Sequence, residues 1–347
     1  MALVINGRFL TRPITGVERY GHALLKVIAR EWPKSKVIVP RSFSGECQAH
    51  GLEVVRAGRM HGHAWEQLEL PRMLGTNDVL LSPANSGPLR AKRHVVAIHD
   101  LAFWHHPEWF STRFSYWYRM LMPRLANRAE RIITVSHASA DDLQRSLFVL
   151  KDKITVVPPF VDGVPFATND DTAIGSPYFL VVGSRDPRKG IDRVLEWYRN
   201  VEDPSFKLVV VGRGRPSFAA SDMSTIEGVI THEDVGDARL AALYRNAIAL
   251  IQPSLLEGFG LPILEAMSLG CPVIANDIPV FRENFNDGAC FIDGASPKAM
   301  TEATQRLIKD VTFRNAAIAR GRTCAARFTE QATAAALHSI LDPLLRN

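Results

Sequence analysis

Cysteine is scarce in this sequence, and the few cysteines are scattered. The 347 residues include four, Cys47, Cys271, Cys290 and Cys324, and no two of them form a Cys-x-x-Cys pair. This spacing argues against a zinc ribbon and a disulfide framework, and it suits a protein of a reducing compartment. We therefore expect these cysteines to be small apolar residues of the core.

Long apolar runs are missing as well. No stretch reaches the ~18 uninterrupted apolar residues that a membrane-spanning helix requires. The start, Met1-Ala-Leu-Val-Ile-Asn6, is a short apolar run without a basic leader, so it predicts a first strand and not a signal peptide. The cytoplasm is the expected location.

Patterns that hold metal ions are also absent. The sequence contains no Asp-x-Asp pair. The histidines that invite a metal interpretation, His61, His63, His105 and His106, form no helical His-x-x-x-His pair. No metal is therefore expected.

The charge of the chain is moderately basic. Lysine and arginine outnumber aspartate and glutamate by 41 to 36, giving a net charge of +5. This indicates anionic partners such as nucleotide phosphates or anionic lipids. No RNA- or DNA-binding signature accompanies the charge, so nucleic acid is not an expected partner.

Short apolar runs alternate with helical patterns, which is typical of an α/β protein with parallel sheets and crossover helices. In the first half, strands are expected at 2–5, 36–39, 79–81, 95–98 and 131–135, and helices at 16–30, 111–127 and 139–147. In the second half, strands are expected at 178–182, 207–211, 249–252 and 273–275, and helices at 191–200, 237–246 and 262–269.

The length suggests two domains, each with its own core. A strand that runs into Pro158-Pro159, followed by a polar stretch, marks the expected boundary. We assign 1–163 to a first Rossmann-like domain and 164–329 to a second. Residues 330–347 are apolar at helical spacing, and we expect this helix to pack back on the first domain. Two doubly wound sheets place the carboxyl ends of their strands around a cleft.

The most informative segment is Pro253-Ser-Leu-Leu-Glu-Gly-Phe-Gly-Leu-Pro-Ile-Leu-Glu-Ala-Met267. Gly258 and Gly260 allow backbone to approach a ligand closely. A proline follows where a helix would begin, and the unbonded N–H groups of a first helical turn form an anion site. Glu257 in the loop and Glu265 one turn into the helix would flank that site. Carboxylates accept hydrogen bonds from hydroxyl groups of a sugar or a ribose.

This segment resembles the signature of the large retaining glycosyltransferase family 4, in which two glutamates are separated by seven residues. In that family the first glutamate contacts the donor sugar and the second binds the ribose hydroxyls. The resemblance therefore implies these roles for Glu257 and Glu265. Further donor-binding positions that it implies are Gly258, Phe259, Gly260 and Leu261 in this segment and Gly16 in the family's first glycine-containing loop, here Thr15–Tyr20.

The resemblance runs nearly end to end, and it implies a GT-B fold, with two Rossmann-like doubly wound domains facing each other across a cleft. The first domain would bind the acceptor and the second the nucleotide sugar. The implied activity is a retaining transfer of a hexose, with mannose favoured, to a hydroxyl of a saccharide or lipid-linked glycan. Bacterial polysaccharide or lipopolysaccharide biosynthesis is the usual setting. The nucleotide sugar is a substrate, so no cofactor is expected.

Cleaving a sugar from a nucleoside diphosphate builds negative charge on the leaving group. Without a metal, cationic side chains and helix N-termini must stabilise that charge. Val182–Gly190 matches the family's phosphate-binding loop, and the resemblance implies a phosphate contact for Lys189. Many relatives carry an arginine directly after the loop's first glycine, where this chain has Ser184. Either Arg185 or Arg188 would supply the guanidinium instead, and both alternatives stay open.

His99 follows the expected strand 95–98 and would lie at a carboxyl end of the first sheet. The matching histidine of the family lies close to the donor sugar, so the resemblance implies a sugar contact here. A purely structural histidine is the alternative. A neutral imidazole would hydrogen-bond a hydroxyl without acting as a general base. With Glu257 and Lys189, His99 completes the set of candidate catalytic residues, and Asp100 is expected to orient His99 or its loop.

Residues 104–131 interleave aromatic side chains with arginines. Such a segment is compatible with an anionic membrane surface and a lipid-linked acceptor. A helix packed into the first domain, with its arginines in solvent, is favoured because the family commonly has aromatics here. Peripheral contact with the inner face of a membrane stays open. Two other functions stay open: a non-catalytic nucleotide-sugar-binding subunit, and another GT-B enzyme such as a nucleotide-sugar epimerase.

Overall fold

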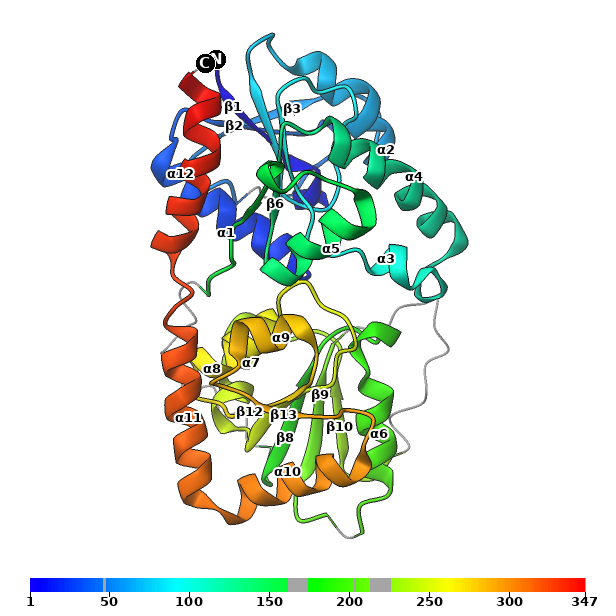
Figure 1. Cartoon of the computed structure of the whole chain (residues 1–347), viewed down its shortest axis with the longest axis vertical. Helices are drawn as coiled ribbons and strands as arrows, with labels where there is room; N and C mark the ends of the chain where they lie inside the picture. The colour runs from blue at the N-terminus through cyan, green and yellow to red at the C-terminus, as the bar shows by residue number, and fades with distance from the viewer. Residues whose placement is uncertain (46–47, 162–173, 203, 213–225, 347) are drawn as a thin grey trace. The chain divides into compact units, whose positions relative to one another are not determined.

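The computed structural model describes residues 1–45, 48–161, 174–202, 204–212 and 226–346 (Figure 1). It divides into two compact units. The first consists of Met1–Phe160 together with Phe328–Asn347, and the second of Val161–Arg327. The unit limits lie a few residues before the domain limits expected at 163 and 329. Cys47, one of the four cysteines, lies outside the described residues.

The first unit is built on a seven-stranded parallel sheet in the order β3-β2-β1-β4-β5-β6-β7. Its strands are β1 (Leu3–Asn6), β2 (Lys36–Pro40), β3 (Glu53–Ala57), β4 (Val79–Ser82), β5 (His94–Ala97), β6 (Arg131–Thr134) and β7 (Ile154–Val156). The central strands are continuous buried runs because layers cover both faces of the sheet. The chain reverses its direction across the sheet between β1 and β4, which is the switch point of this fold.

Three long helices accompany this sheet: α1 (Gly16–Glu31), α4 (Thr112–Arg128) and α5 (His137–Leu147). Shorter turns are η1 (Gly7–Thr11), α2 (Gly62–Ala64), η2 (Trp65–Glu69), η3 (Leu70–Met73), α3 (Ala102–His105), η4 (Pro107–Trp109) and η5 (Lys151–Lys153). Local chemistry sets where the long helices begin. Thr15 and Glu18 form a capping box on α1, and Ser136 caps α5 by accepting from the Ser139 amide at 3.1 Å.

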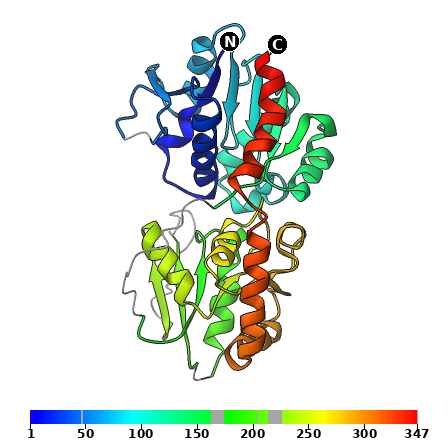
Figure 2. The same cartoon turned by 90° about the vertical axis from the view of Figure 1, so that its left-hand side faces the viewer.

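The last helix, α12 (Glu330–Arg346), belongs to the first unit and runs beside α1 (Figures 1 and 2). Its apolar face is buried, and Thr333 Oγ1 donates to the Pro158 carbonyl at 2.8 Å. On its polar side, His338 contacts Glu31 of α1 at 3.1 Å. Burial of one apolar stripe and polar contacts beside it fix the helix on this unit.

The second unit contains a six-stranded parallel sheet in the order β10-β9-β8-β11-β12-β13. Its strands are β8 (Tyr178–Val182), β9 (Lys207–Val211), β10 (Val229–His232), β11 (Ala249–Gln252), β12 (Val273–Asn276) and β13 (Cys290–Ile292). Its helical segments are η6 (Pro187–Lys189), α6 (Ile191–Arg199), α7 (Asp237–Asn246), α8 (Leu261–Ser268), α9 (Pro279–Phe285), α10 (Pro297–Lys309) and α11 (Val311–Ala325). Here the switch point lies between β8 and β11.

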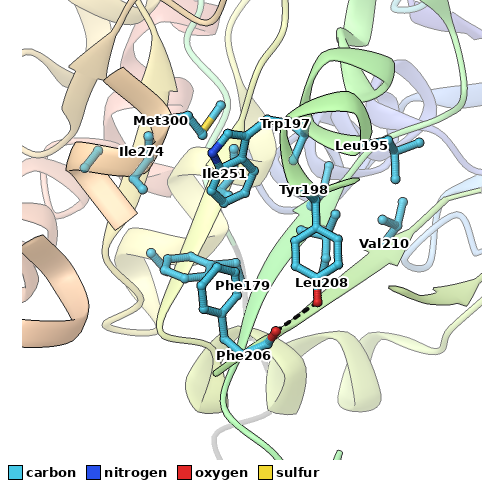
Figure 3. Packing of buried hydrophobic residues seen from close by; sticks show 14 of the residues in the cluster. Phe179, Leu195, Trp197, Tyr198, Phe206, Leu208, Val210, Ile251, Ile274 and Met300 are labelled. Carbon is cyan, nitrogen blue, oxygen red and sulfur yellow. Dashed lines mark hydrogen bonds between the residues drawn. The ribbon is translucent and has the colours of Figure 1, made fainter. Parts of the chain in front are cut away.

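The core of the second unit is rich in aromatic residues. Phe179, Trp197, Tyr198 and Phe206 pack together with aliphatic side chains such as Leu208 (Figure 3). The Tyr198 hydroxyl donates to the Phe206 carbonyl at 2.9 Å, so the polar end of this buried ring is satisfied. This packing fixes the sheet whose carboxyl edge carries the candidate site.

Both sheets are parallel and doubly wound, as the alternation of apolar runs and helices predicts. Cys271 and Cys324 are buried and Cys290 packs at the edge of the second core, as expected of core residues. Cys324 Sγ also accepts from Arg327 Nη2 at 3.0 Å, so its environment is partly polar. Within the described residues, no helix combines the length and apolar content that crossing a bilayer requires.

Candidate functional site

Lys189 and Glu257 meet at the switch point of the second sheet. Lys189 ends the turn η6 that follows β8, and Glu257 lies in the loop that follows the neighbouring strand β11. Lys189 Nζ donates to Glu257 Oε1 at 2.5 Å. The two side chains are only 14% and 9% exposed, so the pair is largely shielded from solvent. Two residues that are far apart in sequence thus join where open α/β sheets bind ligands.

Backbone contacts lock the two loops together. The Leu255 amide donates to the Arg188 carbonyl at 2.7 Å. Gly190 has a positive φ of 64°, and a Cβ at this position would come within 2.4 Å of the Pro253 carbonyl oxygen. Only glycine accommodates both the conformation and the close approach. The side chain of Asp186 accepts from the Arg188 amide at 3.2 Å and begins the turn that ends with Lys189.

Two further donors reach the same oxygen of Glu257. Ser254 Oγ donates to Oε1 at 2.9 Å, and Gln252 Nε2 approaches it at 3.4 Å. Both side chains are buried at the end of β11. The sequence interpretation missed these two residues as site components, although Ser254 lies in the signature segment.

The segment after Glu257 turns sharply into α8. Gly260 has a φ of 108°, and a Cβ there would clash with the Phe281 ring at 2.7 Å. Phe259 is buried and packs edge-on against Phe285, with ring centroids 5.4 Å apart. Its side chain therefore anchors the loop in the core, and a donor could meet only its backbone.

The start of α8 has fewer unbonded N–H groups for an anion than the sequence predicted. Pro262 has no N–H, and the Ile263 and Leu264 amides donate back to the Gly260 carbonyl at 3.0 and 3.3 Å. Three of the first four residues of α8 therefore offer no open N–H group to an anion. Four open N–H groups, as in an ideal first turn, are therefore not present here.

Glu265 lies one turn into α8, as predicted. The hydroxyl of Tyr244, a buried residue of α7, donates to Glu265 Oε2 at 2.9 Å. This contact fixes the carboxylate from the side of the core. Tyr244 is a third residue that the sequence interpretation did not single out, after Ser254 and Gln252.

The two candidate arginines have different environments. Arg188 Nε lies 3.3 Å from Oδ2 of Asp186, a fully buried carboxylate. Arg185 lies 3.9 Å from the exposed Glu233. Among the described residues, the buried Nε atoms of both arginines lack a hydrogen bond, so the ion pair with Asp186 is what distinguishes Arg188. The two arginines therefore differ in their carboxylate partners: Arg188 pairs with a buried carboxylate of its own turn, whereas Arg185 approaches an exposed one at a longer distance.

In the first unit, His99 lies just beyond the carboxyl end of β5 and is buried. Its Nε2 lies 3.1 Å from the Pro83 carbonyl, which can only accept. Burial lowers the pKa of the imidazole. The ring is therefore neutral at physiological pH, with its proton on Nε2 and an acceptor at Nδ1.

The neighbours of His99 fix its backbone as well. The Asn85 side chain accepts from the His99 amide at 2.7 Å, and Ser139 Oγ donates to the His99 carbonyl at 2.9 Å. Asp100 accepts from the Ala102 amide at 3.0 Å, so it organises the loop, one of the two roles predicted for it. Gly16 is the first residue of α1, directly after the cap Thr15.

A buried polar network occupies the switch point of the first sheet, between β1 and β4. Glu66 accepts from Arg8 Nε at 3.0 Å, Asn6 Nδ2 at 2.7 Å and Ser86 Oγ at 2.9 Å. Burial opposes ionisation of Glu66, yet hydrogen bonds from His63 and Asn6 and the charge of Arg8 hold its pKa at about 2. The sequence interpretation missed this network. Arg8, two residues after the end of the first strand, was the available signal.

Each of the four histidines considered for metal binding contacts a different residue. The partners of His61, His63, His105 and His106 are Ser42, Glu66, Asp142 and Glu108. In the part of the chain that the structure describes, no three His, Cys, Asp or Glu side chains are grouped so that they could hold a metal ion.

Comparison with known proteins places these features in a family. The family model described as Glycosyltransferase Family 4 matches residues 14–163, and the one described as Glycosyl transferases group 1 matches residues 169–323. The chain is 28% identical over 270 residues to O-antigen chain mannosyltransferase RfbU of Salmonella typhimurium, covering 76% of this chain and 73% of that protein. It is 27% identical over 367 residues to O-antigen chain mannosyltransferase B of Escherichia coli, covering 95% and 96%.

Solved structures show the same fold. The crystal structure of HepE from Anabaena, in complex with UDP and glucose, superposes with a TM-score of 0.76 at 16% identity, over 99% of this chain and 100% of that one. Because the two family models match the two structural units in turn, and the two parallel-sheet units superpose on a glycosyltransferase of known structure, this chain belongs to the family 4 type of glycosyltransferases and has the GT-B fold.

Proposed function

We propose that this glycosyltransferase transfers a hexose, with mannose favoured, from a nucleotide sugar to a hydroxyl of a saccharide or lipid-linked glycan. The relatives named above are O-antigen mannosyltransferases, which supports mannose and a role in bacterial polysaccharide or lipopolysaccharide assembly. HepE, a structural neighbour, binds UDP and glucose, which supports a nucleotide-sugar donor. The observation that carries the proposal is the shielded contact between Lys189 and Glu257 at the switch point.

In the proposed reaction, the bond between the anomeric carbon and the diphosphate oxygen breaks, and the acceptor oxygen bonds to that carbon on the same face. The acceptor proton passes to the departing phosphate oxygen, so the configuration is retained. Lys189 would stabilise the negative charge that grows on the diphosphate. Glu257 would accept from hydroxyls of the donor sugar, and Glu265 from those of the ribose. In this proposal, no metal or cofactor takes part.

Arg185 is the arginine that we assign to the diphosphate. Its contact with the exposed Glu233 is long at 3.9 Å, whereas Arg188 Nε lies 3.3 Å from the buried Asp186 carboxylate. A guanidinium with unused donors binds phosphate oxygens in a bidentate manner. Arg188, held by buried Asp186, would instead support the loop that carries Lys189.

His99 is proposed to accept a hydrogen bond from a sugar hydroxyl. Its Nε2 proton is directed to the Pro83 carbonyl, which makes Nδ1 the acceptor of a neutral ring. A ring that burial keeps neutral fits a hydrogen-bonding role better than a proton-transfer role.

We also propose that the protein acts in the cytoplasm, at the inner face of the membrane. The exposed face of α4 carries Phe114, Tyr116, Trp117 and Met120. Arginines accompany them on the same helix, and α4 contains no acidic residue. Aromatic side chains with arginines suit the interface of an anionic bilayer, where a lipid-linked acceptor would be found.

A panel of nucleotide sugars tests the donor. A ligand that binds only the folded protein raises the unfolding midpoint, so GDP-mannose should raise it more than UDP-glucose or dTDP-rhamnose does. The donor that binds should then support transfer to a glycan pool, with retention read from the anomeric coupling in the product. Binding without transfer to any acceptor would favour a non-catalytic subunit. An epimerised nucleotide sugar formed without acceptor would favour an epimerase.

A further inference from the structure

The described donors to Glu257 all converge on one of its two carboxylate oxygens. Lys189 Nζ, Ser254 Oγ and Gln252 Nε2 reach Oε1 at 2.5, 2.9 and 3.4 Å. None of the residues that the structure describes donates to Oε2. A carboxylate accepts on both oxygens, so Oε2 keeps its capacity for a hydroxyl of a ligand.

Ser254 connects two of these groups in a directed chain. Gln252 Nε2 donates to Ser254 Oγ at 2.8 Å, and Ser254 Oγ donates to Glu257 at 2.9 Å. A serine hydroxyl has a single hydrogen. Because its oxygen already accepts from the amide, its proton is directed to the carboxylate. The Ser254 backbone is fixed too, since Asn276 Nδ2 donates to its carbonyl at 3.0 Å.

The orientation of the Gln252 amide has a cost in stability. With Nε2 facing Ser254 and Glu257, Oε1 is buried without a hydrogen-bond partner among the described residues. The opposite orientation would direct a carbonyl oxygen at the carboxylate. A buried acceptor without a partner destabilises the fold. Proteins tolerate such a loss of stability at sites where it positions a functional side chain.

We propose that Ser254 and Gln252 are positioning residues for the donor sugar. They hold Glu257 with Oε1 toward Lys189 and leave Oε2 for a sugar hydroxyl. Neither residue contacts the sugar, and both act through Glu257. This inference rests on the proposed function, because it assumes that Glu257 meets the donor sugar.

A cycle of four proteins tests it: the wild type, Ser254→Ala, Glu257→Gln and the double variant. The measured quantity is the affinity for GDP-mannose relative to GDP, by calorimetry, or for the nucleotide sugar and diphosphate that the panel selects. We expect Ser254→Ala to reduce this preference about tenfold, since a misplaced group loses its hydrogen bond, while the affinity for the diphosphate alone is unchanged. In the Glu257→Gln background, the same change should have no further effect.

Equal losses in both backgrounds, or no loss in either, would overturn the inference. Ser268→Ala is the matched control, because among the described residues Ser268 Oγ donates to the Leu264 carbonyl of its own helix, at 2.8 Å, and not to Glu257. Ser254→Thr keeps the hydroxyl and should retain more of the preference than Ser254→Ala does. If the wild type binds no nucleotide sugar, the proposed function itself fails. If it binds and transfers but the cycle is additive, only this inference fails.

Discussion

Lys189 is the residue at which the proposed chemistry is most directly tested. Its ammonium lies 2.5 Å from Glu257 Oε1 and is largely shielded from solvent, so it needs little reorganisation to meet a diphosphate. We expect Lys189→Met to reduce kcat/KM by a factor of about 10² to 10³, as removal of one preorganised donor typically does. Steady-state kinetics with the selected donor measure this. Lys298→Met, at an exposed lysine of α10, should leave kcat/KM unchanged. Wild-type rates in Lys189→Met would contradict the assignment.

Gly190 joins the two loops of the site, and a side chain there would push them apart. A Cβ would lie 2.4 Å from the Pro253 carbonyl oxygen, at a φ of 64°. We expect Gly190→Ala to lower the free energy of unfolding by about 1–3 kcal/mol, the typical cost of a strained backbone position. Urea denaturation measures the change. The control is Gly236→Ala at the start of α7, where a Cβ meets nothing within 4 Å and φ is −64°. Equal stability of the two variants would refute the steric argument.

At the scale of the elements, His338 links α12 to α1. Burial lowers its pKa and the hydrogen bonds with Glu31 and Asp342 raise it, and the net pKa is raised. A raised pKa means that the stabilisation is fully present below about pH 6.5, the pKa of the unfolded chain, and is lost as pH rises through the folded pKa. Arg30 also forms an ion pair with Glu31, so the Glu31 carboxylate is shared between Arg30 and His338.

The prediction for this contact concerns the unfolding midpoint. The unfolding midpoint of the wild type should exceed that of His338→Gln by more at about pH 5.5 than at about pH 8.5. The reason is that only the protonated imidazole is stabilised by both carboxylates. Thermal scans of both proteins at the two pH values measure the difference. His61→Gln is the control, since His61 contacts the Ser42 hydroxyl rather than a carboxylate. A gap that is independent of pH would rule out the ionic contribution.

The sequence interpretation did not predict the edge strands β3, β10 and β13 or the helices α9, α10 and α11. β3 contains only exposed and half-buried positions, and β10 is half-buried throughout, because both are edge strands with one free side. β13 has only three residues, too few to show a period. The central strands, by contrast, are continuous apolar runs and were predicted nearly to the residue.

At the scale of the whole molecule, the proposed attachment to a membrane can be tested with lipid vesicles. If the arginines of α4 meet anionic lipid, the protein should co-sediment with vesicles of phosphatidylglycerol and phosphatidylethanolamine, and less with phosphatidylcholine alone. Replacing Arg113, Arg119 and Arg124 with glutamine should weaken this binding by about 1 kcal/mol per charge removed. Added salt should weaken it too.

The control for this prediction keeps the same net charge. Glutamines at Lys34, Lys298 and Lys309, three exposed lysines outside α4, should leave vesicle binding nearly unchanged. If both triple variants lose binding equally, net charge alone drives the attraction. If the wild type does not bind anionic vesicles, α4 is an ordinary amphipathic helix of the first unit.

The amino-acid sequence alone determined the fold class and the family, because the hydrophobic periodicity and the signature segment both consist of residues that are close together in the sequence. It also placed Glu257 in a loop and Glu265 on a helix, since glycine and proline act locally. Only the tertiary structure decided that Lys189 meets Glu257, that Arg188 is held by Asp186 while Arg185 is not, and that Ser254 and Gln252 direct one carboxylate oxygen. The Lys189–Glu257 contact joins residues 68 positions apart and depends on β8 and β11 becoming neighbours in the sheet, which the local sequence does not encode. The other contacts are local, but their geometry depends on the backbone path that the loops take in the folded unit.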